Sequence, residues 1–221
     1  MHLKREASPK SWPIERKGTK YLVRPNYNTE KGVPILIILR DMLKFADNRT
    51  EAKKALHAKQ VLLNKKAIFD DRENALLFDV ITLIPKKESN LPERNYRITM
   101  NKNKKFDLEE ISSEDSWHKT AKVINKKSLK KKRVQINLSD GRNFISDMKC
   151  NVNDSMRINL KDRKIEKCIP LKENSDAFVF AGKHAGESGV IEQIDKGMNR
   201  VRLNSGGNQI NILIKQLMVL K

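Results

Sequence analysis

Apolar residues in this chain come in short runs that are separated by charged and polar residues. No uninterrupted run is longer than the one from Ile35 to Leu39, whereas a membrane-spanning helix needs about 18 apolar residues in a row. Hydrophobic residues make up 38% of the 221 residues and aromatic residues only 5%, which is a small supply for one large core. We therefore predict three small cores joined by polar chain, and no membrane span.

The charge of the chain is strongly unbalanced. Lys and Arg number 46 and Asp and Glu 27, so the formal net charge is +19. Residues 1–32 contribute +5 and residues 86–133 contribute +8, while the segments that can build cores are nearly balanced. Positive charge concentrated in this way favours an extended polyanion as partner, which indicates a nucleic acid. We expect no membrane partner, because no segment combines a broad apolar helix face with a Lys-rich one.

The sequence offers little for catalysis, metal binding or cofactor binding. It has no phosphate-binding P-loop, no His-Glu-x-x-His, no Gly-x-Ser-x-Gly and no Cys-x-x-Cys. Cys150 and Cys168 are too few for a disulfide framework or a four-cysteine zinc site, and are most simply small buried residues. The N-terminus lacks the apolar stretch of a secretory signal. We expect a non-enzymatic protein of a reducing, cytoplasmic compartment, without catalytic residues, metal, cofactor or small-molecule substrate.

Residues 1–32 read as a basic arm, the name used for this segment below. The arm contains several prolines and glycines but few periodic apolar residues, so we predict an irregular segment with little core of its own, which becomes ordered on a charged surface. Trp12 is its one tryptophan. It either packs against the neighbouring domain, which is slightly favoured, or stacks on a base or ribose, and it is kept among the candidate RNA contacts.

The helical signals lie in residues 33–85. Apolar residues recur at helical spacing over residues 35–46, and Asn48 with Glu51 forms a capping-box pattern that predicts a second helix from Arg49 to about residue 59. Residues 61–69 are typical of a hairpin, and residues 79–84 of a further strand. The second helix presents a polar stripe along one flank, formed by Arg49, Lys53, His57 and Gln60.

The remainder of the chain reads as β-structure. Runs that alternate polar with apolar residues are broken by turn signals such as Asp140-Gly141. Glycines between Gly182 and Gly189 permit positive φ angles and tight corners, as in a small barrel. The predicted fold class is therefore α+β and multidomain, with an arm at 1–32, an ααβ-type module at 33–85, a central β-rich domain at 86–174 and a small barrel at 175–221.

Four blocks follow one another along the chain, at residues 2–26, 39–81, 135–143 and 182–189. In this order they resemble the S-four-e family of small-subunit ribosomal proteins (30S or 40S), and most closely its archaeal members. The arm is similar to the family's opening, and residues 39–81 are similar to its S-four-type RNA-binding module. Residues 135–143 resemble the signature of its middle domain, and residues 182–189 resemble a KOW motif in an SH3-like barrel. The chain departs from the family's pattern at Asn64-Lys65, where glycine is usual, at Asn74 in place of proline, and at Glu187-Ser188 in place of Arg-Val.

This resemblance implies a structural constituent of the small ribosomal subunit that binds rRNA, supports subunit assembly and translation, and touches neighbouring ribosomal proteins. Affinity would come from Lys and Arg that neutralise phosphates, because base edges in an RNA helix are hard to reach. The alternative is a free RNA-binding chaperone or an accessory subunit of an RNA-modifying enzyme. The candidate RNA contacts are Lys4, Arg5, Lys10, Trp12, Arg16, Lys17, Lys20, Arg24, Arg40, Arg49, Lys53, Lys65, Lys66, Lys183 and His184.

Overall fold

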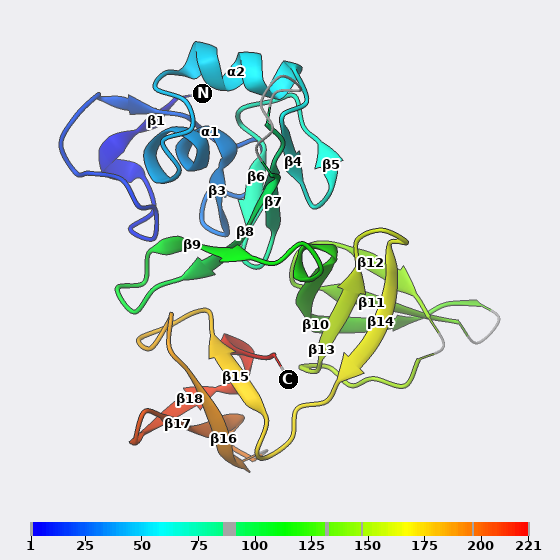
Figure 1. The fold of residues 1–221 in the computed structure, drawn as a ribbon. Helices are drawn as coiled ribbons and strands as arrows, with labels where there is room; N and C mark the ends of the chain where they lie inside the picture. Colours follow the sequence, from blue (N-terminus) through cyan, green and yellow to red (C-terminus); the bar gives the residue numbers. More distant parts are fainter. Residues whose placement is uncertain (1, 86–91, 131–132, 147, 196, 221) are drawn as a thin grey trace. The chain divides into compact units, whose positions relative to one another are not determined.

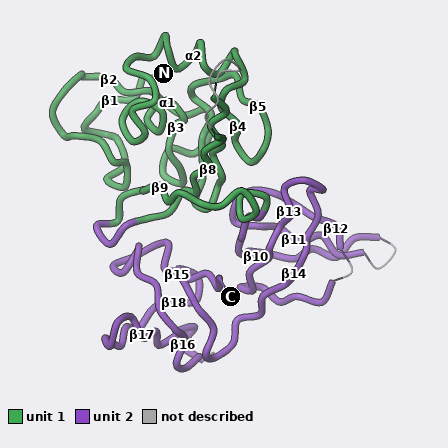
Figure 2. Tube along the Cα trace, in the orientation of Figure 1, with its two compact units in different colours: residues 1–100, 104–117 green, residues 101–103, 118–221 purple. Residues whose placement is uncertain are grey.

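The computed structural model describes residues 2–85, 92–130, 133–146, 148–195 and 197–220. These residues form mostly β-structure, with only two short α-helices, both between residues 35 and 57 (Figure 1). Contacts divide the chain into unit 1, residues 1–100 with 104–117, and unit 2, residues 101–103 with 118–221 (Figure 2). No helix among the described residues is long and apolar enough to cross a membrane. The predicted α+β class thus holds only for unit 1, since the helices are confined there.

Unit 1 is built on a five-stranded antiparallel sheet in the order β5-β4-β7-β8-β9. The predicted boundary between residues 85 and 86 falls inside this sheet, because β7 pairs with β8 from Val80 opposite Arg97 to Leu83 opposite Arg94. The prediction followed the rise in charge after residue 85, but hydrogen bonding between strands decides the extent of a sheet. The strands are β4 (Val61–Leu63), β5 (Lys66–Ala67), β7 (Val80–Leu83), β8 (Arg94–Met100) and β9 (Phe106–Ile111).

The helices of unit 1 begin where local signals predict them. Asn48 caps helix α2 (Arg49–His57) by accepting a hydrogen bond from the Glu51 backbone N–H at 3.0 Å, and the Glu51 carboxylate accepts from the Asp47 N–H at 2.9 Å. The first predicted helix is shorter than its periodicity suggests: α1 (Ile35–Ile37) continues as a π-helical segment, η2 (Ile38–Met42). All residues from 35 to 39 are buried, so this part of the helix is enclosed on every side.

The hairpin between β4 and β5 also agrees with the prediction. Leu63 lies opposite Lys66, and the two residues between them, Asn64 and Lys65, have φ angles of +51° and +61°. This is the left-handed conformation that a two-residue hairpin turn requires, and Asn adopts it more readily than most residues. The turn therefore forms without glycine.

The arm is part of the core of unit 1, which corrects the prediction of an arm without a core. Trp12 is 1% exposed, and its indole Nε1 donates to the Gly32 carbonyl at 2.8 Å. The Phe106 N–H donates to the Ser11 carbonyl at 2.8 Å, which joins the arm to β9. An enclosed indole cannot stack on a base, so Trp12 is a packing residue and not an RNA contact. The arm contains β1 (Leu3–Lys4), the 3-10 turn η1 (Arg5–Ala7) and β2 (Tyr21–Leu22), and leads into β3 (Gly32–Pro34), which pairs with β6 (Asn74–Leu76).

Unit 2 contains two five-stranded antiparallel sheets, and the short 3-10 turn η3 (Asp115–Trp117) precedes it. The central sheet has the order β12-β11-β10-β13-β14, with β10 (His118–Ser128), β11 (Val134–Leu138), β12 (Asn143–Ile145), β13 (Ser155–Asn159) and β14 (Lys164–Ile169). The C-terminal sheet has the order β18-β17-β16-β15-β19, with β15 (Asp176–Val179), β16 (Ser188–Asp195), β17 (Arg200–Ser205), β18 (Asn208–Leu213), the 3-10 turn η5 (Ile214–Gln216) and β19 (Leu217–Val219).

Each of the three five-stranded sheets has its own cluster of buried apolar side chains, as the short apolar runs predict. Three hydrogen bonds, made by two buried side chains, join the sheets of unit 2. Lys122 of β10 donates through Nζ to the Ile214 carbonyl and, at 2.7 Å, to the Leu217 carbonyl. Ser155 of β13 accepts from the Val219 N–H at 3.0 Å. Lys122 thus counts toward the net positive charge of the sequence, although its ammonium group is bonded to backbone carbonyls inside the protein.

Candidate nucleic-acid interface

The predicted RNA contacts differ greatly in how available their charges are. Two groups of cations from unit 1, those of the arm and those of α2, show the extremes and are described first. Most of the predicted cations lie on the surface, namely Lys4, Lys10, Arg16, Lys17, Lys20, Arg24, Arg49, Lys53, Lys66 and Lys183, whereas Arg5, Arg40, Lys65 and His184 are half-buried.

The arm contains a cationic cavity. It has a volume of about 420 Å³, and five of its eight lining residues carry a positive charge while one carries a negative charge. Among the described residues, Arg16 and Lys17 make no ion pair, and Lys4 has only a 3.9 Å contact with the exposed Glu6 carboxylate. Such a concentration of like charge attracts an anion. This arm cavity is lined by Lys4, Arg5, Glu6, Arg16, Lys17, Gly18, Thr19 and Lys20.

Arg5 holds the loop of residues 15–20 that forms one side of the arm cavity. Its guanidinium donates to the Glu15 carbonyl at 2.6 Å, to the Thr19 carbonyl at 2.8 Å and to the Thr19 hydroxyl at 3.0 Å. A Cβ atom on Gly18 would lie 2.9 Å from Arg5 Nη2, so glycine allows the loop to close tightly around the guanidinium. Arg5 was predicted to contact RNA directly; the structure shows that it uses its donors to hold the loop of residues 15–20.

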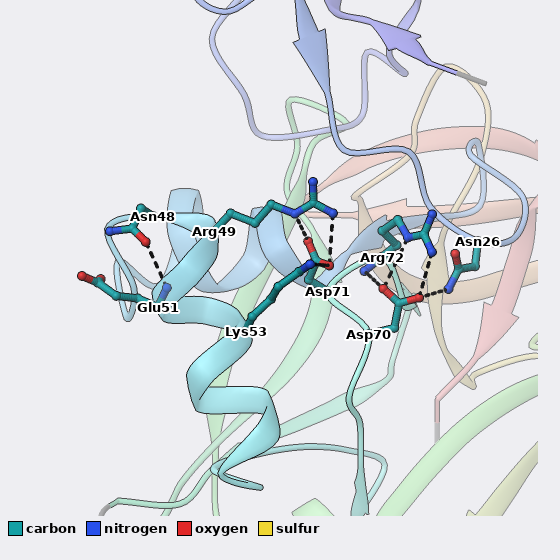
Figure 3. A network of polar contacts seen from close by, with 8 residues as sticks. All are labelled: Asn26, Asn48, Arg49, Glu51, Lys53, Asp70, Asp71 and Arg72. Atoms are coloured by element: carbon teal, nitrogen blue, oxygen red, sulfur yellow. Dashed lines mark hydrogen bonds and ion pairs between the residues drawn. The ribbon is translucent and has the colours of Figure 1, made fainter.

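The cations of α2 are bound to a buried carboxylate. Asp71 is 2% exposed, and Arg49 donates to it from Nε at 2.6 Å and from Nη2 at 3.3 Å (Figure 3). Lys53, one helical turn further on, has its Nζ 3.9 Å from the same carboxylate. The hydrogen bond with Asp71 raises the pKa of Arg49. We call α2 together with residues 70–73 the α2 flank; its cations are therefore partly neutralised by the fold.

The neighbouring residue Asp70 connects the α2 flank to the arm. Its carboxylate accepts from Asn26 Nδ2 at 2.8 Å and from the Arg72 backbone N–H at 2.9 Å, and the Asn26 N–H donates to the Arg72 carbonyl at 3.1 Å (Figure 3). Partial burial acts to raise the pKa of Asp70, but the hydrogen bonds from Asn26 and Arg72 outweigh it and lower this pKa to about 2. The arm is thereby fastened to the flank by a carboxylate that stays ionised.

Two further predicted contacts are also committed internally. Arg40 forms a two-point hydrogen bond with its neighbour Asp41, at 3.0 and 2.8 Å. Lys65, in the hairpin turn, donates to Asn95 Oδ1 at 3.0 Å, and its Nζ lies 4.7 Å from the centroid of the Trp117 ring. Burial lowers the pKa of Lys65. Lys66, the next residue, is exposed and has no ion pair in the described part of the chain.

The C-terminal candidates lie in the loop between β15 and β16. Lys183 is exposed, whereas His184 Nδ1 lies 3.0 Å from the Glu187 carboxylate. Gly182 and Gly186 have φ angles of +90° and +92°, which side chains rarely permit. The glycine pattern predicted this corner correctly, but not the partner that Glu187 provides for His184.

Sequence reasoning noted the charge of residues 126–133 without naming any of them as contacts. Residues 124–133 contain six cations and no carboxylate. β10 pairs with β13 only through residue 122; beyond it β10 pairs with β11 alone, and residues 124–128 are all exposed. We call residues 124–138 the ribbon. Lys126 donates to the Cys150 carbonyl, while Lys127, Lys130 and Arg133 make no ion pair among the described residues.

The central sheet of unit 2 and its loops also contain ionisable groups that are buried inside the protein. Lys119 and Asp140, 2% and 4% exposed, form an ion pair at 2.8 Å. Cys150 and Cys168 are free thiols, and burial together with the negative charge of Asp154 raises the pKa of Cys168 to about 11. Within the described residues, no three His, Cys, Asp or Glu side chains are grouped so as to hold a metal ion.

Known proteins are similar to this chain in sequence and in fold. A profile of Ribosomal family S4e matches residues 93–165, and the profile of the RS4NT (NUC023) domain matches residues 1–27. The chain is 36% identical over 196 residues to the small ribosomal subunit protein eS4 of Methanocella arvoryzae, which covers 87% of this chain and 80% of that relative. The chain belongs to ribosomal family S4e.

Other members show the same relation to this S4e protein. The small ribosomal subunit protein eS4 of Haloarcula marismortui is 32% identical over 219 residues, covering 97% of this chain and 88% of the relative. The crystal structure of the 30S ribosomal protein S4e from Thermoplasma acidophilum matches with a TM-score of 0.73 at 26% identity, covering 86% of this chain and 95% of that chain. This S4e chain is thus a structural ribosomal protein of the small subunit and not an enzyme, as the resemblance implied.

Proposed function

We propose that this S4e protein binds small-subunit rRNA mainly through cations that its own fold leaves unpaired, and that these cations neutralise phosphates. The observation that carries the proposal is the arm cavity, where Arg16 and Lys17 stand beside Lys4 and Lys20 with a single carboxylate among them. Phosphate contacts fix the register of a protein on RNA and supply most of its salt-dependent affinity. Neighbouring ribosomal proteins, and a cytoplasmic ribosome as the location, belong to the same proposal.

The structure supports a ranking of the contacts. The surface cations without a close internal partner contribute most, and this group includes Lys127, Lys130 and Arg133 of the ribbon, a segment whose sequence contains no acidic residue. Cations that already have a partner contribute less, because binding a phosphate would mean giving up an internal contact. The first group is Lys10, Arg16, Lys17, Arg24, Lys66, Lys127, Lys130, Arg133 and Lys183, together with Lys4 and Lys20, which make long, exposed contacts with the Glu6 carboxylate and the Tyr21 ring. The second group is Arg5, Arg40, Arg49, Lys53, Lys65 and His184, whose partners are buried or belong to the same arm, loop or helix.

A KOW-type, SH3-like barrel in residues 175–221 is part of this proposal. Two observations support it: the five antiparallel strands β15 to β19 form one sheet, and at two glycines a side chain would clash with nearby backbone. A Cβ on Gly186 would lie 2.0 Å from the Asn101 carbonyl oxygen, and a Cβ on Gly189 would lie 2.1 Å from the Asn204 carbonyl oxygen. Glycine at these two positions therefore allows the backbone near Lys183 to approach these carbonyls closely.

The salt dependence of rRNA binding tests the proposal. With the full chain and a small-subunit rRNA transcript, we expect the binding constant to fall by roughly 10³- to 10⁵-fold between about 50 and 200 mM salt, as for a protein with several phosphate contacts. A salt slope that corresponds to only one or two ions would overturn phosphate neutralisation as the source of affinity.

Association with the subunit is tested separately by sucrose-gradient sedimentation. We expect the protein to migrate with small subunits and to stay with them through a high-salt wash, because a structural constituent is enclosed by folded rRNA. Release at the first wash would favour a free RNA-binding factor instead.

A further inference from the structure

Tyr21 lies exposed on the arm, although large aromatic side chains usually reduce their exposure by packing. The residue is 50% exposed and belongs to β2, which pairs with β1 so that Tyr21 is directly opposite Lys4. Side chains of directly opposed residues in antiparallel strands lie on the same face. Since Lys4 lines the arm cavity, this pairing brings the Tyr21 ring to the cavity's border.

A second contact also places the ring beside the cavity. Lys20, which also lines the cavity, has its Nζ 5.6 Å from the centroid of the Tyr21 ring. The His2 ring is another neighbour of Tyr21: the two ring centroids are 5.3 Å apart, at an interplanar angle of 47°. The arm therefore presents an aromatic surface and a cationic hollow side by side.

This combination exceeds what phosphate neutralisation requires. Contacts to the backbone of an RNA duplex need positive charge on a surface, but they need neither a hollow nor an aromatic ring. An unpaired nucleotide offers both of the complementary groups: a phosphate, and a base whose face stacks on aromatic side chains. The cavity is open to solvent along its exposed lining residues, and its volume of about 420 Å³ is comparable with that of small-ligand pockets, roughly 300 to 1,000 Å³.

We propose that the arm cavity binds a single unpaired nucleotide of RNA, with its phosphate among Arg16, Lys17 and Lys20 and its base on the ring of Tyr21. This inference rests on the proposed rRNA-binding function and specifies the RNA feature that the arm recognises. Arg5 acts as a positioning residue, because its three hydrogen bonds to Glu15 and Thr19 shape the loop before RNA arrives. Glu6 adds the cavity's one carboxylate, an acceptor for a ribose hydroxyl or a base amino group.

The test compares two RNA hairpins of equal length, one with a single-nucleotide bulge and one fully paired, each titrated into the full chain. We expect tighter binding of the bulged hairpin. Tyr21→Leu keeps an apolar side chain in β2 but removes the aromatic face, and we expect it to weaken binding of the bulged hairpin by roughly 5- to 150-fold while leaving the paired one unchanged. Tyr21→Phe retains the ring and is expected to bind like the parent.

Tyr27→Leu is the matched control, because Tyr27 also lies in the arm, is 73% exposed and does not line the cavity. Chemical shift changes of the Tyr21 ring on titration with adenosine monophosphate provide a second measurement that does not depend on a variant. The nucleotide site is overturned if the parent binds both hairpins equally well. It is also overturned if Tyr21→Leu weakens binding of both hairpins equally, or weakens binding of neither. If salt-dependent binding of rRNA persists in that case, the proposed function stands without it; if that binding is also missing, the proposed function fails too.

Discussion

The arm and the α2 flank carry similar cations in the sequence, yet the fold treats these charges in opposite ways. The flank is fastened by its cations: Arg49 and Lys53 are drawn to the buried carboxylate of Asp71. The arm is fastened by an apolar anchor, Trp12, while Arg5 binds two carbonyls and a hydroxyl within the arm itself. The way a segment is attached thus decides whether its remaining charges are available to a partner.

The largest expected effect comes from removing the arm's anchor. Trp12→Ala should lower the free energy of unfolding by about 3–5 kcal/mol, because it leaves a cavity in the core and the Gly32 carbonyl without its donor. Urea denaturation of the full chain measures this loss. Tyr27→Ala, an exposed aromatic residue of the same arm, should change stability by less than about 0.5 kcal/mol. Equal values for the two variants would show that the arm is not anchored by Trp12.

Removing the flank's anchor should cost less stability than Trp12→Ala, and it should also strengthen RNA binding. Asp71→Ala removes a charged hydrogen-bond acceptor and should cost about 1.5–3 kcal/mol. It also releases Arg49 and Lys53, so RNA binding should become tighter and more salt-dependent. The exposed Asp162→Ala is the control for removal of one negative charge. If Asp71→Ala binds RNA no more tightly than this control, the flank's cations are not restrained by Asp71.

Paired neutralisations compare the two regions directly. Arg16→Gln with Lys17→Gln should weaken RNA binding and reduce the salt slope by about two ions, because both cations are free to meet phosphates. Arg49→Gln with Lys53→Gln removes the same charge but should change the slope by less than one ion, while lowering stability. Titrations of both double variants across salt concentrations measure this difference. A larger loss from the flank pair would reverse the proposed ranking of contacts.

Low pH should weaken the hydrogen bonds of Asp70 that connect the arm to the α2 flank. Among these predictions it should give the smallest change in stability. The pKa of Asp70 is about 2 in the folded chain against an ordinary 3.8, so its carboxylate stabilises the folded state at neutral pH, and this contribution is lost as the pH falls from about 4 to about 2. The effect is modest because Asp70 is partly exposed. Thermal melts of Asp70→Asn should show a shallower loss of stability over this range than the parent. Identical slopes would mean that Asp70 does not link Asn26 to Arg72.

Local features of the sequence determined several elements of the structure. The capping pattern of Asn48 and Glu51 set the start of α2, and the Asn64-Lys65 turn set the hairpin, because these signals act over a few residues of chain. The short apolar runs predicted three cores. The surplus of cations, together with the order of the family-like blocks, correctly indicated a ribosomal protein of the small subunit.

Only the tertiary structure decided which cations are free. Arg49 meets Asp71 across 22 residues of sequence, and Lys122 reaches the Leu217 carbonyl across 95, so neither pairing leaves a mark in the local pattern. The same holds for Trp12, which the fold encloses, and for β8 and β9, which extend the sheet of unit 1 beyond the predicted boundary. Charge is a property of each residue, whereas its neutralisation depends on residues that folding brings within a few ångströms.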